Sequence, residues 1–250
     1  MKRIQRIDEE MGRLRVRVKD TEDLKVWGDV FDVPTLKALY QLANKGIIKA
    51  MGGVVSTGKE ANVFHAIGKE GELAIKIYKI ATSDFKVMQE YLIGDPRFKN
   101  IKHSKKDIVL AWARKELRNL SRAYDAGVRV PKPIVVERNI LVMEFIGKDG
   151  VPAPLLKDIA YEIEDPAELL AQIVDYMKAL YNKAKLVHAD LSEFNILYDG
   201  VPVFIDMGPS VTRDHPNAEA FLLRDVKNVV RFFRKLGVEC SEEEVIARIR

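Results

Sequence analysis

The sequence is poor in cysteine, with Cys240 as the only one among 250 residues. A single cysteine excludes an internal disulfide framework, which favours a reducing compartment and an inert role for Cys240. Long uncharged apolar runs are also missing, so no membrane span is predicted. The first twenty residues carry charges throughout and lack the apolar core of a secretory signal. We therefore expect a cytoplasmic protein without a membrane partner.

A strong excess of one charge sign is missing as well. The 41 Lys and Arg residues against 37 Asp and Glu residues give a formal net charge of +4. This excess is too small to indicate a nucleic-acid partner by itself. The length allows one large domain or two lobes with a sizeable core. Composition therefore bounds the class of protein but not its activity.

Hydrophobic periodicity predicts an ordered series of helices and strands after a charged amino-terminal segment that we expect on the surface. In the first part of the chain it predicts a helix over 34–46, antiparallel strands over 47–80, a helix over 107–127 and a hairpin over 133–147. In the second part it predicts a helix over 166–185, a hairpin over 196–206, a helix over 217–237 and a last helix opened by a capping box from Ser241 to Glu244.

Two segments interrupt this pattern. Residues 81–106 mix polar, basic and apolar residues with little periodicity, which predicts a mobile loop. Residues 148–154 are rich in glycine and proline and are typical of a hinge. We therefore expect an amino-terminal lobe over 1–146 and a carboxy-terminal lobe over 147–250. Trp27 and Trp112 are predicted to be core aromatics.

The stretch "LVHADLSEFNIL", followed by an apolar run that ends in Asp206, places three oxygen-bearing side chains where a helix meets a hairpin. Phosphoryl transfer needs a divalent metal held against the phosphates and an acceptor hydroxyl held in line. Asp190 can accept or orient the acceptor proton, whereas Asn195 and Asp206 can bind the metal through hard oxygen atoms. With His188, these residues match the kinase pattern H-x-D-L-x-x-x-N, and "DMG" stands where kinases have D-F-G.

Upstream residues supply the rest of this pattern in the expected order. "LAIKIYK" resembles the kinase V-A-I-K strand and places Lys76 where it can meet nucleotide phosphates, with Glu116 as its expected ion-pair partner. Taken singly, Lys76 and Glu116 are equally compatible with solvated surface positions. Asp190 and Asn195 are in the same way compatible with ordinary turns. The joint order favours the catalytic interpretation.

The region that should bind phosphate departs from ordinary kinases, because "VVSTGKEANVF" lacks a repeated-glycine motif. Ser56, Thr57, Gly58 and Lys59 still offer hydroxyl, backbone N–H and ammonium groups for phosphate. A plain hairpin turn is the alternative. A second departure follows Asp206, where the chain has little room for an activation segment and no A-P-E sequence before the next predicted helix.

Together, "STGKEANVF", "LVHADLSEFNIL" and "FIDMGPSV" resemble the RIO family of atypical serine protein kinases over nearly the whole chain. The resemblance is greatest to the Rio-one subfamily in a minimal form such as archaea carry. It implies an α+β, trimmed bilobal kinase-like fold, with an antiparallel sheet and a long helix in the first lobe and a mainly helical second lobe. It also implies ATP with Mg²⁺ or Mn²⁺, serine autophosphorylation, and a role in maturation of the small ribosomal subunit.

The resemblance also implies individual roles. Asp190 becomes the catalytic aspartate, Asn195 and Asp206 the metal ligands, and Lys76 the lysine that contacts phosphate. It assigns Ser56 and its loop to the triphosphate. It assigns the adenine-contacting hinge to Met143, Glu144, Phe145 and Ile146. An ATPase switch through a phosphorylated Asp206 is implied too, while Pro209 in the metal loop departs from the family pattern.

Further residues support hypotheses with open alternatives. A basic run can contact the phosphates of ribosomal RNA in a small-subunit precursor, or it can be a solvated loop. This run contains Arg97, Lys99, Lys102, Lys105 and Lys106. Asp225 either braces the catalytic loop or is a surface or capping aspartate. Ser83, Ser104 and Ser121 are candidate autophosphorylation sites.

Two rival functions belong to other classes. A small-molecule phosphotransferase of the aminoglycoside or choline kinase type also has an H-x-D motif with a following asparagine, but its usual "HGDLHPGN" differs from "HADLSEFN". The "STGKEA" sequence favours the RIO interpretation. A non-catalytic ribosome-binding module is the other alternative, and it is expected to have lost part of the set formed by Lys76, Asp190, Asn195 and Asp206.

Overall fold

The computed structural model describes residues 31–80, 85–98 and 104–250. The charged amino-terminal segment and Trp27 lie outside these residues, as do 81–84 and 99–103 of the predicted loop. The described chain forms two compact units. The first takes in 31–80, 85–86, 104–117 and 133–152, and the second takes in 87–98, 118–132 and 153–250. The predicted lobe boundary at residue 146 stays a prediction.

The first unit is built on a five-stranded antiparallel sheet with the strand order β1-β2-β3-β5-β4. Its strands are β1 (Ile48–Thr57), β2 (Ala61–Gly68), β3 (Glu72–Tyr78), β4 (Pro133–Glu137) and β5 (Ile140–Glu144). The predicted strands over 47–80 and the hairpin over 133–147 are thereby confirmed. Arg138 has a positive φ of 55° in the turn between β4 and β5, where the sequence predicted a reversal.

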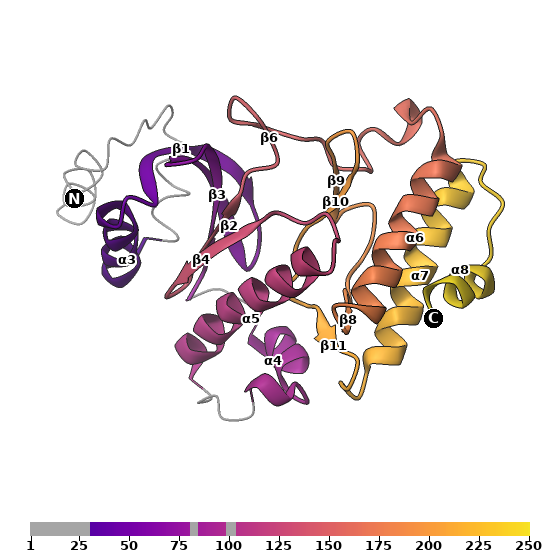
Figure 1. The fold of residues 1–250 in the computed structure, drawn as a ribbon. Coiled ribbons are helices and arrows are strands. Elements are labelled where there is room, and N and C mark those ends of the chain that lie inside the picture. Colours follow the sequence, from indigo (N-terminus) through magenta and orange to yellow (C-terminus); the bar gives the residue numbers. More distant parts are fainter. Residues whose placement is uncertain (1–30, 81–84, 99–103) are drawn as a thin grey trace. The chain divides into compact units, whose positions relative to one another are not determined.

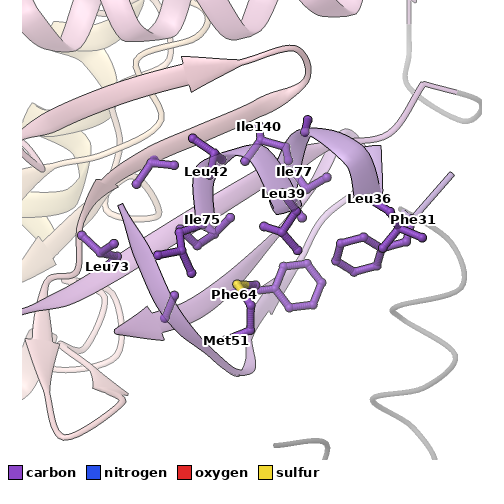
Figure 2. Close-up of a cluster of buried hydrophobic side chains, with 14 residues drawn as sticks. Phe31, Leu36, Leu39, Leu42, Met51, Phe64, Leu73, Ile75, Ile77 and Ile140 are labelled. Atoms are coloured by element: carbon purple, nitrogen blue, oxygen red, sulfur yellow. The ribbon is translucent and has the colours of Figure 1, made fainter. Parts of the chain in front are cut away.

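Helix α3 (Val33–Asn44) covers one face of this sheet (Figure 1). It begins one residue before the predicted start at Pro34, because the Asp32 side chain accepts a hydrogen bond from the Thr35 N–H at 2.8 Å and thereby satisfies a donor of the first turn. Its apolar face, with Leu36, Leu39 and Leu42, contributes to a cluster of buried side chains that also includes residues of the sheet (Figure 2). This cluster is the core of the first unit.

Helix α5 (Lys105–Asp125) is the long helix predicted from residue 107 onwards. It begins two residues earlier than expected, and the Ser104 hydroxyl accepts a hydrogen bond from the Asp107 N–H at 3.2 Å. Trp112 is buried, as predicted. A short hairpin of β6 (Gly147–Lys148) and β7 (Val151–Pro152) follows β5 within the first unit.

The second unit is mainly helical. Helices α6 (Pro166–Asn182), α7 (Ala218–Lys235) and α8 (Glu242–Ile249) pack together (Figure 1). The shorter elements are β8 (Leu186–Val187), β9 (Ile196–Tyr198), β10 (Pro202–Phe204), β11 (Val211–Thr212) and the 3₁₀ helix η2 (Ala160–Glu162). The predicted hairpin of β9 and β10 is confirmed, with Gly200 at a φ of 73° in its turn. The capping box from Ser241 to Glu244 is confirmed as well.

The prediction of a mobile loop over 81–106 was wrong for its described part. Residues Phe85–Leu92 form helix α4, and Pro96–Phe98 form the 3₁₀ helix η1. Met88 and Leu92 are buried, and the ring of Tyr91 packs on Phe221 of α7 with centroids 5.3 Å apart. The apolar residues four positions apart indicate a helical face, but the polar residues between them hid this signal.

None of the described helices is both long enough and apolar enough to cross a membrane.

Candidate active site

Lys76 on β3 and Glu116 on α5 form the ion pair that the sequence predicted. The Lys76 Nζ atom lies 2.8 Å from one carboxylate oxygen of Glu116 and 2.9 Å from the other. Glu116 is 1% exposed and also accepts a hydrogen bond from the Tyr78 hydroxyl. A buried carboxylate is stable only when it is paired and hydrogen-bonded. Glu116 therefore holds the Lys76 ammonium in one position.

The predicted phosphate-binding residues lie at the end of β1 and in the turn that leads to β2. Ser56, Thr57, Gly58 and Lys59 are all exposed. The Gly58 N–H donates to the Ala61 carbonyl at 2.9 Å, which closes the turn. The backbone here forms the hairpin turn that the sequence analysis gave as the alternative to a phosphate-binding loop. In this structure the Gly58 N–H is used within the turn, whereas the hydroxyls of Ser56 and Thr57 and the Lys59 ammonium belong to exposed residues. Phosphate binding by Ser56, Thr57, Gly58 and Lys59 stays a prediction.

The predicted adenine-contacting segment leaves the sheet at the end of β5. Met143 and Glu144 are half-buried, whereas Phe145 and Ile146 are buried. The hairpin that follows is anchored by Glu72, whose carboxylate accepts hydrogen bonds from the N–H groups of Asp149 at 3.1 Å and Gly150 at 2.6 Å. Sequence analysis did not identify this role of Glu72.

The Glu72 carboxylate also lies 2.8 Å from the Nε2 atom of His65. Burial acts to raise the pKa of Glu72, but the hydrogen bonds from Gly150, His65 and Asp149 outweigh it and lower the pKa overall. The charged form of Glu72 is thus the form that fixes the hairpin.

The catalytic loop brings Asp190 and Asn195 together in the second unit. The Asn195 amide nitrogen donates to the Asp190 backbone carbonyl at 2.8 Å and to its carboxylate at 3.0 Å. Because the amide nitrogen faces Asp190, the amide oxygen is the atom with lone pairs for a metal. The structure thus places the Asp190 carboxylate beside the Asn195 amide, and their roles in proton transfer and metal binding stay predictions.

Asp206 follows β10 and is joined to the same loop through its neighbour. The Ile205 N–H donates to the Asn195 carbonyl at 3.0 Å. Asp206 has a positive φ of 58°, which is uncommon for a residue with a side chain and recurs at functional sites. Burial raises the pKa of Asp190, and the nearby charge of Asp206 raises it further. Asp190 and Asp206 therefore interact electrostatically.

His188 contacts the backbone of the residue before Asp206. It is buried, and its Nε2 atom lies 3.0 Å from the Ile205 carbonyl oxygen. Burial lowers the pKa of His188 to about 4, although the bond to Ile205 and the charge of Asp206 oppose this. The imidazole is therefore neutral near pH 7 and donates from Nε2, so that it secures the residue before Asp206.

Asp225 on α7 braces the catalytic loop. Its two carboxylate oxygens accept hydrogen bonds from the N–H groups of Ala189 at 2.7 Å and Leu191 at 2.9 Å, on either side of Asp190. The bracing hypothesis is thus confirmed over the surface alternative. Arg224, which sequence analysis did not consider, donates to the Ala189 carbonyl. Ala189 has a φ of 70°, so adjacent residues of α7 fix an uncommon backbone conformation next to Asp190.

The donor set of the second unit suits a hard cation. Mg²⁺ prefers oxygen ligands and is usually held by one or two carboxylates, with water and phosphate oxygens completing its shell. Asp206 supplies a carboxylate and Asn195 an amide oxygen. Among the residues that the structure describes, no group of three or more His, Cys, Asp or Glu side chains forms a metal site of its own.

Comparisons with known proteins identify the family. The sequence model of the RIO domain matches residues 62–246. The chain is 49% identical over 242 residues to "RIO-type serine/threonine-protein kinase Rio1" of Haloferax volcanii, which covers 96% of this chain and 82% of that protein. It is 43% identical to the protein of the same name from Methanocaldococcus jannaschii, covering 91% of this chain and 78% of that protein. The chain therefore belongs to the RIO domain family, as its motifs predicted.

Other similar proteins are longer than this chain. "Serine/threonine-protein kinase RIO1" of Homo sapiens is 45% identical over 226 residues, which cover 89% of this chain and 40% of the human protein. Among solved structures, the Rio2 kinase from Chaetomium thermophilum superposes with a TM-score of 0.65 at 24% identity, over 86% of this chain and 67% of that chain. A second structure of that protein, its ADP/Mg²⁺-phosphoaspartate complex, also gives a TM-score of 0.65. The likeness confirms the trimmed kinase-like fold.

The chain between Asp206 and the next long helix is short, as the sequence predicted. Residues 207–217, with the short strand β11, lead directly from Asp206 into α7. The prediction of little room for an activation segment is confirmed. Of the rival functions, the small-molecule phosphotransferase loses support because the family is now identified.

Proposed function

We propose that the chain is an ATP-dependent serine/threonine protein kinase of the RIO type that also hydrolyses ATP. The observation that carries this proposal is the complete set of polar groups in a member of this family. Lys76 is paired with Glu116, Asn195 is bonded to Asp190, and Asp206 influences the ionisation of Asp190. A non-catalytic binding module has no need to keep these contacts.

In the proposed reaction, Lys76 binds nucleotide phosphate, and Asn195 with Asp206 holds Mg²⁺ or Mn²⁺. The bound cation supplies charge neutralisation of the phosphate oxygens. Asp190 accepts the proton of a serine or threonine hydroxyl. The hydroxyl oxygen forms a bond to the γ-phosphorus while the bond from that phosphorus to the bridging oxygen breaks, and ADP leaves. The raised pKa of Asp190 suits a group that must take up a proton during transfer.

Hydrolysis gives Asp206 a second role, that of a nucleophile. A carboxylate oxygen of Asp206 attacks the γ-phosphorus, ADP leaves, and water then cleaves the resulting acyl phosphate to give phosphate and free Asp206. The positive φ of Asp206 supports this role, because uncommon backbone conformations recur at functional sites.

Incubation of the purified protein with γ-labelled ATP and Mg²⁺ tests both reactions. Free phosphate and protein-bound label are measured together, and the bond is treated with hydroxylamine and acid. Label that hydroxylamine removes, and that is absent in Asp206→Asn, supports the hydrolytic route. Stable phosphoserine with little free phosphate identifies transfer as the main activity. Neither product in the wild type, at protein concentrations high enough for single turnover, contradicts the proposal.

We further propose a precursor of the small ribosomal subunit as partner, with ribosomal RNA contacted through the basic run between Arg97 and Lys106. Of its described cations, Arg97 forms an ion pair with Asp95 at 2.7 Å, Lys105 lies over the Phe85 ring at 5.0 Å, and Lys106 is exposed. The lysines, rather than Arg97, therefore suit phosphate contacts. Replacement of Lys105 and Lys106 by glutamine should weaken RNA binding. It should also make the slope of the logarithm of the binding constant against the logarithm of salt concentration less steep, by about one to two released counterions. An unchanged salt slope contradicts this partner surface.

A further inference from the structure

Asn119 lies on α5 and connects this helix to the loop that follows Asp206. The side chain is fully buried, at 0% exposure. Its amide nitrogen donates to two backbone carbonyls, those of Met207 and Ser210, each at 2.8 Å. Two acceptors on one amide nitrogen fix the orientation of the side chain, because the amide oxygen cannot replace the nitrogen against two carbonyl oxygens.

The two acceptors are the ends of one tight turn. The Ser210 N–H donates to the Met207 carbonyl at 3.3 Å, so residues 207–210 reverse direction directly after Asp206. Pro209 lies inside this turn, where it has no N–H to contribute. Asn119 donates hydrogen bonds to both ends of the turn and so holds them together. The presence of Pro209, unexpected from the family pattern, is thereby compatible with an ordered loop.

The Asn119 amide oxygen has no hydrogen-bond partner among the described residues. This oxygen carries a desolvation cost, whereas the amide nitrogen makes two hydrogen bonds. An apolar side chain of similar size would remove that cost, but it would leave the Met207 and Ser210 carbonyls without these bonds. The specific contribution of Asn119 is therefore to hold the two ends of the 207–210 turn.

We infer that Asn119 is a positioning residue for the metal loop, which sets the backbone after Asp206 so that its carboxylate is presented to the divalent cation of the nucleotide. This inference rests on the proposed function. Asn119 touches neither nucleotide nor metal in this role and acts through Asp206. Supports of this kind typically change metal affinity or activity by about 10–100-fold when they are removed.

The test uses the variants Asn119→Ala and Asn119→Asp in the full chain. Aspartate keeps the size of the side chain but cannot donate to the two carbonyls when ionised. Asn182→Ala is the matched control, because its amide nitrogen also donates to a backbone carbonyl, that of Ile249 at 2.6 Å, between α6 and the end of α8. Thermal unfolding of each variant first identifies those that fold.

The readout is the affinity for N-methylanthraniloyl-ADP, measured by fluorescence in Mg²⁺ and in EDTA. We expect the ratio of these two affinities to fall about 10–100-fold in the Asn119 variants, with the affinity in EDTA unchanged. Asn182→Ala should keep the wild-type ratio even where its melting temperature falls. Hydrogen exchange of the amides in 207–211 should also accelerate in the Asn119 variants and not in Asn182→Ala.

The outcomes separate this inference from the function on which it rests. A wild-type protein whose nucleotide affinity does not depend on Mg²⁺ overturns the proposed metal site and the role of Asn119 with it. A normal Mg²⁺ dependence in the wild type that persists unchanged in a folded Asn119 variant overturns the role of Asn119 alone. If both Asn119 variants melt below the assay temperature, their hydrogen exchange is measured at a temperature at which they are folded. Amide exchange that is faster than in the wild type evenly over 153–250, and not mainly in 207–211, would show a general loss of stability and would overturn the inference.

Discussion

Lys76 contacts both carboxylate oxygens of Glu116, at 2.8 and 2.9 Å, although the two residues are 40 positions apart in the sequence. The strand β3 supplies one charge and the helix α5 the other. Because Glu116 is buried and also bonded by Tyr78, the pair is better defined than a surface salt bridge. Its geometry allows a direct test of the role of Lys76.

Lys76→Met should lower the turnover of ATP about 10²–10³-fold, because it removes a fixed positive charge from the phosphates. The measurement is release of labelled phosphate and incorporation of label at saturating ATP. Lys45→Met is a suitable control, since Lys45 forms an exposed ion pair with Glu137 at 3.0 Å. Such pairs contribute about 0–1 kcal/mol, so this variant should keep wild-type turnover. Equal losses in both variants would contradict the role of Lys76.

Asp190→Asn should lower phosphoryl transfer to serine about 10²–10⁴-fold, because an amide cannot accept the hydroxyl proton. Nucleotide binding should change little, since Asn195 and Asp206 remain. Asp199→Asn, in the exposed turn between β9 and β10, controls for the loss of a negative charge. If Asp190→Asn kept turnover within a few-fold of wild type, Asp190 would not be the base.

His188 should make the protein less stable as the pH falls. Its pKa is about 4 in the folded protein and 6.5 in its unperturbed state, so the unfolded chain binds the proton first. The stability that this residue contributes is complete above pH 6.5 and is lost towards pH 4, by up to about 1.4 kcal/mol per pH unit. Comparison of urea unfolding for wild type and His188→Gln over pH 4–7 measures this contribution. A stability difference between the two proteins that does not vary with pH would contradict the low pKa.

Asp225 should have the opposite effect in nearly the same range. Burial raises its pKa from 3.8 to about 7, against the opposing bonds from Leu191 and Ala189. The folded protein therefore retains the proton longer than the unfolded chain, and this contribution to stability is lost as the pH rises from about 4 to 7.

The contributions of Asp225 and His188 should cancel in the wild type between about pH 4 and 6.5. Asp225→Asn should reveal the histidine contribution as stability that rises with pH, whereas His188→Gln should reveal the aspartate contribution as stability that falls with pH. Each variant is unfolded in urea at several pH values. The same slope in both variants would contradict the opposed pKa shifts.

The sequence predicted most of the fold because its periodic segments are long and their ends carry clear signals. Asp32 before α3 and Ser241 before α8 act as caps in the structure, as their residue types indicate. Helix α4 was missed because polar residues separate its apolar ones, and because Tyr91 of this helix packs on Phe221, far away in the sequence. A contact with a residue so distant in the sequence cannot be read from local periodicity.

The residues to which we assign direct chemical roles could be selected from the sequence, whereas most of the residues that hold them in place could not. Lys76, Asp190, Asn195 and Asp206 belong to a spaced motif that can be recognised in the sequence. Asn119 donates to backbone carbonyls far away in the sequence, with Met207 at a separation of 88 residues. Because every residue has a backbone carbonyl, a sequence motif cannot show which carbonyl accepts the hydrogen bond.

Helix α5 carries Glu116 and Asn119 three residues apart, and this spacing limits how its length can change. A single inserted residue between them would rotate one side chain by about 100° relative to the other around the helix axis. On one side of such an insertion Glu116 bonds Lys76, and on the other Asn119 bonds Met207 and Ser210. Natural insertions and deletions should therefore be rarer within residues 116–119 than at the ends of α5.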